Sequence, residues 1–231
     1  RSELISLLKE EFKVDPDKGA HARFLSLEMI WPDNALLRAY VLSPRLGQIS
    51  ADLLGVPAVR LYHDNVLAKQ AGCGRTPWHF DDHHFPLDTN DVVTAWAPAQ
   101  PIPLEMGPLS FAYPLDVHKL VNAVTFEKTG TGYDRGVTDV FSKNNVTVNE
   151  TPFELGEVSF HHNLNFHTAS RNQTNRSRVA LANTYYRDGA RIVDSPTMVS
   201  GDWQKFVPNV KPGDLAASPL NPICWPVKDK S

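Results

Sequence analysis

The stretch PAVRLYHDNVLA, residues 57–68, marks the point at which the pattern of the sequence changes. From here the chain consists of short runs rich in β-branched and aromatic residues, separated by Gly, Pro, Asn and Asp, which is typical of strands joined by turns. The later runs are DVVTAWA (91–97), GPLSFAY (107–113), GEVSFHHN (156–163) and RVALANTYYR (178–187). Because most of them have no helix between them, the sequence predicts a mainly β fold, an antiparallel sandwich, barrel or jelly roll.

The segments on either side of this core have a different character. Residues 1–56 read as helical, with Leu4, Leu7 and Leu8 on one face of a first helix and a Ser43-Pro44 start to a second that ends at Gly55. We expect one domain over 1–231, made of a helical layer at about 1–56, a β core at about 57–192 and a C-terminal extension at about 193–231. Residues 115–151 are polar and include TGTGYDRG, so we interpret them as an excursion that could act as a lid or binding loop.

Composition excludes several classes of protein. The formal net charge of the 231 residues is -3, and no dense Lys/Arg block provides a surface for nucleic acid. No apolar run approaches the ~20 residues that span a bilayer. The two cysteines form no CxxC motif, which favours a reducing compartment. We therefore expect a cytoplasmic protein, a monomer or homodimer, with a small-molecule substrate and with neither nucleic acid nor membrane as a partner.

The stretch TPWHFDDHHFP, residues 76–86, contains three histidines and two aspartates within six positions. On a strand, residues i and i+2 point to the same side, so His79 and Asp81 could reach one ion while Phe80 packs on the other face. An HxD motif arises often by chance, and on its own it is weak evidence for a metal site.

A third ligand is available downstream, where His167 ends an alternating run and is followed by a turn-rich segment and a second run that opens at Arg178. If these two runs are adjacent antiparallel strands, the turn returns Arg178 to the level of His167. Two histidines and one carboxylate form the facial triad of non-haem Fe(II) oxygenases. A nearby arginine could bind the carboxylate of a dianionic co-substrate with its two-pronged guanidinium. Arg171 and Arg176 compete for that role.

These residues resemble a known family. In the phytanoyl-CoA dioxygenase family of Fe(II)- and 2-oxoglutarate-dependent oxygenases, a WHxD motif precedes a distal His, and an Arg follows that His by eleven positions. Here Trp78-His79-Phe80-Asp81 matches, His167 and Arg178 have the required spacing, and the family's intervening Asn and Ser/Thr are similar to Asn172 and Thr174. The resemblance spans about residues 57–192 and includes the MGPLSF turn and strand.

The resemblance implies a double-stranded β-helix, or jelly roll, with iron held by His79, Asp81 and His167. It implies that Arg178 binds 2-oxoglutarate and that Lys69 also contacts it, and Thr94 and Trp96 are candidates to line the same pocket. The expected reaction uses Fe(II), 2-oxoglutarate and O2 and releases succinate and CO2. We expect a hydroxylation of a secondary metabolite, amino acid or lipid-like acid, with no catalytic residue beyond the metal ligands.

Other polar residues near the motif are candidates for the substrate pocket. In a regular strand Asp82 and His84 would point away from the ion, and His83 would lie one step beyond the ligands. His118 follows Tyr113-Pro114-Leu115-Asp116, which stands where the family has a Pro-Gly-Ser-His sequence. We assign Asp82, His83, His84 and His118 to substrate binding or to support of the ligands. One of His161 and His162 could be a buried partner, and a ligand role for either is the alternative.

Two other classes of function remain open from the residues alone. A zinc hydrolase could use the same His, Asp and His with an open water position, although it has no need of the arginine. A non-catalytic jelly-roll binding module could retain the fold with an inactive site.

Overall fold

The computed structural model describes residues 1–18, 22–125, 132–196 and 201–227. Its helices are α1 (Ser2–Phe12), α2 (Ala35–Val41), α3 (Pro44–Leu54), α4 (Val117–Leu120) and α5 (Gly132–Lys143), with short 3-10 turns at Asp82–His84, Leu104–Met106 and Trp203–Lys205. Its strands are β1 (Phe24–Glu28), β2 (Val59–Lys69), β3 (Thr76–His79), β4 (Val92–Pro98), β5 (Leu109–Tyr113), β6 (Thr147–Glu150), β7 (Ser159–His162), β8 (His167–Ala169), β9 (Arg178–Arg187) and β10 (Ile223–Trp225).

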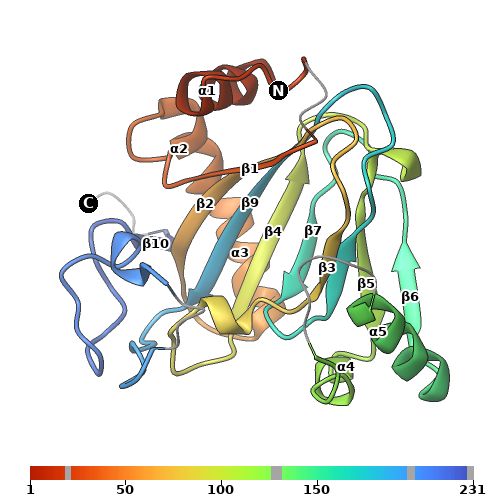
Figure 1. The fold of residues 1–231 in the computed structure, drawn as a ribbon. Coiled ribbons are helices and arrows are strands. Elements are labelled where there is room, and N and C mark those ends of the chain that lie inside the picture. The colour runs from red at the N-terminus through yellow and green to blue at the C-terminus, as the bar shows by residue number, and fades with distance from the viewer. Residues whose placement is uncertain (19–21, 126–131, 197–200, 228–231) are drawn as a thin grey trace.

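Two antiparallel sheets face each other, as expected for a double-stranded β-helix (Figure 1). The larger sheet has the order β1-β2-β9-β4-β7, with β10 paired to the start of β2, and the smaller has the order β3-β8-β5-β6. All five predicted runs form strands, and the predicted jelly-roll class is confirmed. The central strand β9 pairs with β2 over almost its whole length, from Lys69–Arg178 to Val59–Arg187, and with β4 on its other side.

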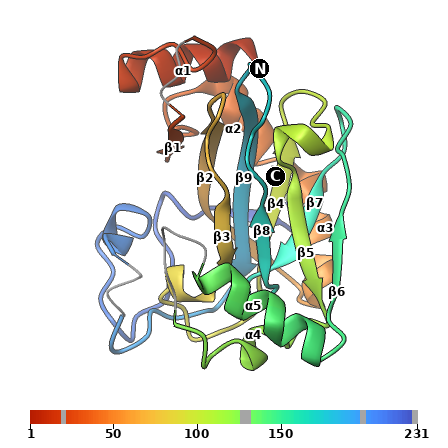
Figure 2. The same ribbon diagram turned by 45° about the vertical axis from the view of Figure 1, so that its right-hand side comes forward.

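Helices cover the outer faces of both sheets. α3 lies behind the larger sheet and packs on β2, β4, β9 and β10 (Figure 1). It starts at Pro44 and ends at Leu54, just before Gly55, whose φ of 67° is the left-handed conformation that favours glycine at a helix end, as the sequence predicted. α5 lies across the outside of the smaller sheet (Figure 2), where the rings of Phe141, Trp78 and Phe166 contact one another.

Three segments differ from the sequence-based expectation. Residues 24–28 lie inside the stretch expected to be helical, but they form β1 and pair with residues 65–69 of β2. The excursion at 115–151 contains α4, α5 and β6, and β6 extends the smaller sheet by pairing with β5; residues 126–131 lie outside the described ranges. The C-terminal extension supplies β10 to the larger sheet. Short strands of this kind have little periodicity, which explains why they were not predicted.

The turn between β8 and β9 is organised by the buried side chain of Asn172. Its amide nitrogen donates to the backbone carbonyls of Lys69, Gln70 and Arg176 at 2.7–3.2 Å, and its Oδ1 accepts from the backbone N–H and hydroxyl of Thr174. One side chain therefore joins the end of β2 to the turn that precedes Arg178.

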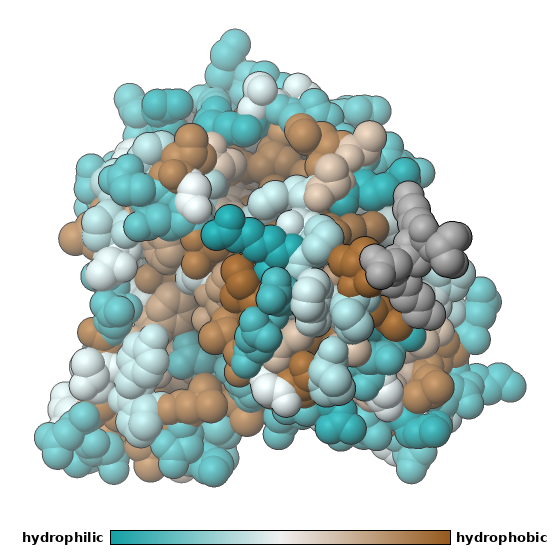
Figure 3. Space-filling model, turned by 180° about the vertical axis from the view of Figure 1, so that it is seen from behind, coloured by the Kyte–Doolittle hydropathy of each residue, from teal (hydrophilic) through white to brown (hydrophobic). Residues whose placement is uncertain are grey.

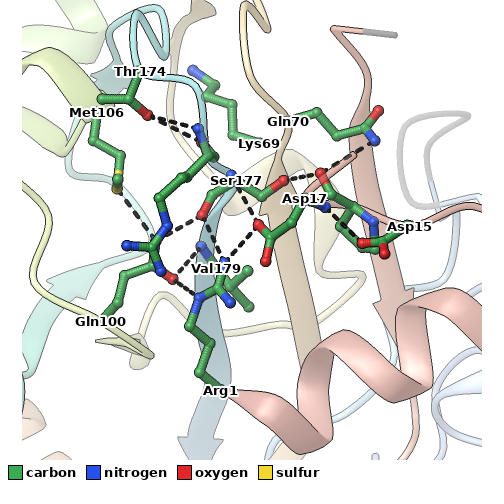
Figure 4. Close-up of polar contacts among 12 residues, drawn as sticks. Arg1, Asp15, Asp17, Lys69, Gln70, Gln100, Met106, Thr174, Ser177 and Val179 are labelled. Carbon is green, nitrogen blue, oxygen red and sulfur yellow. Dashed lines mark hydrogen bonds and ion pairs between the residues drawn. The ribbon is translucent and has the colours of Figure 1, made fainter. Parts of the chain in front are cut away.

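A second polar network fixes the residues on both sides of Arg178 (Figure 4). Gln100 donates to the carbonyl of Ser177 at 2.6 Å, and its Oε1 accepts from Val179 N–H at 3.4 Å and from Arg1 Nε at 2.7 Å. Asp17 accepts from the N–H of Ser177 and forms an ion pair with Arg1. The N-terminal segment thus stabilises the start of β9.

The surface seen from behind the view of Figure 1 has small hydrophobic patches separated by hydrophilic side chains (Figure 3). Among the helices of the described residues, none combines the length and the apolar character that crossing a bilayer requires.

The Asn172 network yields a stability prediction. Replacing Asn172 with Ala removes the hydrogen bonds that its buried side chain forms with three backbone carbonyls and with the N–H and hydroxyl of Thr174, so we expect the free energy of unfolding to fall by about 2–4 kcal/mol. Urea unfolding measures this. Asn175→Ala in the same turn is the matched control, because Asn175 is exposed and its loss should change stability by less than about 0.5 kcal/mol. Equal losses in the two variants would contradict the role given to Asn172.

Candidate active site

The side chains of His79, Asp81 and His167 come together between the two sheets. One potential ligand atom from each lies within 4.8 Å of the other two. The register of β3 and β8 pairs His79 directly with His167, which places both imidazoles on the inner face of the smaller sheet. The geometry is that of a three-ligand metal site.

Asp81 reaches this site in a way that the sequence did not predict. β3 ends at His79, and Asp81 has helical dihedral angles (φ -87°, ψ -13°) at the start of the turn Asp82–His84. The backbone carbonyl of Asn163 accepts from the N–H groups of both Asp81 and Asp82, at 2.8 and 3.2 Å, and fixes the turn. The assumption that HFD is a regular strand was therefore wrong, although the histidine and the carboxylate still converge.

The hydrogen bonds of the two histidines fit them for metal binding. Nδ1 of His79 lies 2.8 Å from the carbonyl of Pro77, and Nδ1 of His167 lies 2.9 Å from that of Asn165. A carbonyl accepts only, so each Nδ1 carries the proton and each Nε2 has a free lone pair. Outer partners of this kind orient metal-binding histidines.

Burial also keeps the histidines neutral. Burial, with the nearby His79 imidazole, lowers the pKa of His167 to about 3, and burial likewise lowers the pKa of His79. Burial by itself would raise the pKa of Asp81, but the surrounding imidazoles, His167 foremost, hold it well below its usual range. Two neutral imidazoles and one carboxylate are the protonation states that a divalent cation requires.

Arg178 enters the same cavity from the opposite sheet. Its side chain is 1% exposed, one terminal nitrogen donates to the carbonyl of Gly107 at 2.8 Å, and the guanidinium lies 5.4 Å from the Trp96 ring centre. Burial lowers the pKa of Arg178 to about 10, which leaves it cationic at neutral pH. Among the described residues no carboxylate lies within 4.0 Å of it, and its Nε has no hydrogen-bond partner. A buried cation of this kind needs an anion, and a bound carboxylate would supply it.

The expectation that His167 and Arg178 lie on adjacent antiparallel strands was also wrong. β8 and β9 are not neighbours, because β8 pairs with β3 and β5 in the smaller sheet while β9 lies in the larger one. The turn between them crosses from one sheet to the other, so that His167 and Arg178 line the same cavity from opposite walls.

Two contacts hold the sheets together at this crossing. Lys69 is 1% exposed and donates to the carbonyls of Ala169 and Ser170 at 3.0 and 2.7 Å. Gly107 has a φ of 74°, and a Cβ there would lie 2.3 Å from the carbonyl oxygen of Ser170, so only glycine allows this approach. Burial, with the Arg178 charge, lowers the pKa of Lys69 to about 7.

The cavity has a volume of about 480 Å³ and contains some but not all of the predicted residues. Thr94, Trp96, Arg178, His84 and the three proposed ligands line it. Lys69 is not among the lining residues, and its amine binds backbone instead, so its contact with a co-substrate stays a prediction. His84 lines the cavity because the chain turns after Asp81 and not because of strand alternation.

The remaining candidates lie elsewhere. Asp82 and His83 line a separate depression of about 270 Å³, and His118 contacts the ring of Phe80 at a centroid distance of 5.1 Å. Of the excursion at 115–151, no described residue lines the main cavity. Residues from the two ends of the chain line it instead, namely Phe24, Ser26 and Glu28 of β1 and Gly201, Asp202, Lys205 and Phe206.

Two further histidines line the cavity wall. His63 was not identified from the sequence, and His161 was not placed beside the metal site. His63 faces the cavity from β2, and its ring lies 4.9 Å from Phe206 and 6.1 Å from Phe85. His161 lies beside the proposed ligands, with Nε2 3.5 Å from Oδ2 of Asp81. Alternation along β2 and β7 could have placed them on the inner face, but not beside a metal site.

Comparison with known proteins identifies a family and several solved structures with a similar fold. The family model described as "Phytanoyl-CoA dioxygenase (PhyH)" matches residues 9–180. None of the curated proteins matches the chain significantly in sequence.

Solved structures match the fold over nearly the whole chain. The carbocyclase SnoK from nogalamycin biosynthesis is 23% identical, with a TM-score of 0.72 over 96% of this chain and 87% of that chain. The epimerase SnoN, in complex with Fe3+, alpha ketoglutarate and nogalamycin RO, is 20% identical, with a TM-score of 0.70 over 96% and 90%. EctD from S. alaskensis, with 2-oxoglutarate and 5-hydroxyectoine, is 15% identical, with a TM-score of 0.65 over 95% and 81%.

The position of His63 predicts a pH dependence of stability. Burial lowers the pKa of His63 to about 4, below the unfolded value of about 6.5, so the unfolded chain binds the proton more tightly. The stabilisation is complete above pH 6.5 and is lost as the pH falls toward 4. We expect His63→Asn to reduce the loss of unfolding free energy between pH 7.5 and 5 by about 1–2 kcal/mol. Urea unfolding of the metal-free protein at the two pH values measures this.

His83→Asn is the control, because His83 is exposed and its replacement should leave the pH dependence unchanged. A His63→Asn variant that shows the full wild-type loss would contradict the prediction.

Proposed function

The chain belongs to the phytanoyl-CoA dioxygenase family of Fe(II)- and 2-oxoglutarate-dependent oxygenases, and from this premise we propose that it hydroxylates a small organic molecule. The balanced reaction converts substrate R–H, 2-oxoglutarate and O2 into R–OH, succinate and CO2. The observation that supports it best is the pairing of a buried, uncompensated Arg178 with the His79, Asp81 and His167 triad in one cavity.

The protein's own part is to hold the reactants and exclude water. His79 and His167 would present their Nε2 lone pairs to Fe(II), and the Asp81 carboxylate would be the third ligand, the donor set that leaves positions on the iron open to other groups. The bound iron and co-substrate supply the oxidative chemistry. Arg178 binds the far carboxylate of 2-oxoglutarate with a charged fork, and Trp96 and Leu109 line that end of the cavity.

Asp81 favours hydroxylation over halogenation, because a halide needs the position that the carboxylate takes. Ring closure and epimerisation are the activities named for SnoK and SnoN, so the same fold supports outcomes other than hydroxylation. We retain hydroxylation as the proposal for this chain.

The other end of the cavity supports a compact substrate. His63, Phe85 and Phe206 form a wall of rings, and Lys205 at the rim forms an ion pair with Glu28 at 2.6 Å. With Lys205 paired and Arg178 reserved for 2-oxoglutarate, the described cavity residues offer no cluster of free cations for the phosphates of a CoA ester. We propose a small substrate with a ring or apolar face, of the secondary-metabolite kind.

Anaerobic titration with Fe(II) and 2-oxoglutarate tests the proposal. The chelate gives a weak visible charge-transfer band, which we expect in the wild type. Arg178→Ala should need at least about 30-fold more 2-oxoglutarate, because the far carboxylate loses a buried charged partner. Arg178→Lys should fall between the two, since it retains the charge but lacks the fork.

Arg176→Ala is the matched control, because Arg176 is exposed two residues before Arg178 and should leave the titration unchanged. A wild type without any band, but with zinc-dependent hydrolysis, would favour the zinc hydrolase. Failure to bind either metal would favour the binding module.

A further inference from the structure

His161 contacts the proposed metal-binding carboxylate of Asp81 through the oxygen that His79 and His167 do not face. It lies on β7, is 5% exposed, and its Nε2 is 3.5 Å from Oδ2 of Asp81. The Nε2 atoms of His79 and His167 lie instead near the other oxygen, Oδ1, at 3.6 and 3.9 Å. The two carboxylate oxygens therefore face different partners.

The ring of His161 is fixed by its neighbours. It packs against the rings of His167 and Phe111, at centroid distances of 4.6 and 5.6 Å, and its strand register pairs it with Thr94 of β4. It also forms the wall between the main cavity and an open groove of about 1000 Å³ on the outside, between β5 and β7. A buried side chain that packs against two other rings can define the direction of a hydrogen bond.

Geometry separates His161 from the ligands. The group of ligand atoms within 4.8 Å of one another consists of His79, Asp81 and His167, and it does not include His161. Its buried Nδ1 has no hydrogen-bond partner among the described residues. Leaving a nitrogen lone pair unpartnered in the interior costs less than leaving an N–H donor unpartnered. The proton therefore belongs on Nε2, the nitrogen that faces Oδ2 of Asp81.

We propose that His161 is a positioning residue that donates from Nε2 to Oδ2 of Asp81 and so limits the carboxylate to one metal-binding oxygen, Oδ1. This inference rests on the proposed function. A carboxylate free to turn could bind the ion through both oxygens, and it would then take one of the three positions that 2-oxoglutarate and O2 need. Outer partners of metal ligands typically change metal affinity 10–100-fold when they are removed.

The test compares His161→Phe with His161→Gln. Phenylalanine retains a flat ring against Phe111 but cannot donate, whereas glutamine retains an N–H donor. By competition with a colorimetric Fe(II) chelator under anaerobic conditions, we expect His161→Phe to weaken Fe(II) binding about 10–100-fold. Its 2-oxoglutarate charge-transfer band should also move in wavelength. His161→Gln should stay within about threefold of the wild type and keep the wild-type band.

His162→Phe is the matched control, because His162 is the next residue on β7 and its Nδ1 accepts from the backbone of Leu164. It should bind Fe(II) like the wild type, and thermal unfolding should show all three variants to be folded. Unchanged affinity and band in His161→Phe would overturn the proposal. So would a complete loss of Fe(II) binding in both His161 variants, matching Asp81→Ala, since that would make His161 a ligand. A wild type that binds no Fe(II) would instead contradict the proposed function.

Discussion

The register between β3 and β8 is the constraint on which the site depends. It sets His79 opposite His167 and fixes how far apart their imidazoles lie. A slip of one residue would turn one of them to the outer face, where α5 packs, and leave a single histidine inside. Thr76 pairs with Ala169 on the far side of a register shift in β3, and the Lys69 amine holds the end of β8 by donating to the carbonyls of Ala169 and Ser170. The larger sheet thereby maintains the position of the smaller one.

Much of the fold could be predicted because five strands have strong alternation and are separated by clear turn residues. The triad and Arg178 could be proposed because their spacing is distinctive and their chemistry is complementary. The way in which these residues come together in one cavity could not be predicted, since it depends on Asp81 leaving the strand and on β8 and β9 lying in different sheets. Both are tertiary features: the backbone carbonyl of Asn163 holds the turn at Asp81, and the side chain of Asn172 organises the turn between β8 and β9.

The side-chain directions of the residues that follow His79 also could not be predicted from strand alternation. Regular alternation from His79 through His84 would put His84 outside, but the turn after Asp81 changes the direction of each later side chain. β1 was hidden in a stretch with helical patterns on both sides. The contact between His161 and Asp81 joins residues 80 positions apart, and it depends on the turn after β3 meeting the end of β7, where the N–H of Asp81 donates to the carbonyl of Asn163.

The walls of the cavity come from separate parts of the chain, and this division has an evolutionary consequence. The co-substrate end is built from β4, the start of β5 and β8–β9, all in the middle of the chain, whereas β1 and residues 201–206 meet through Glu28 and Lys205 at the other end. Drift, insertion or exchange in these two terminal segments can therefore reshape which molecule enters without disturbing the residues proposed to hold iron and 2-oxoglutarate. Such a chain can acquire new substrates while its oxidative chemistry stays constant.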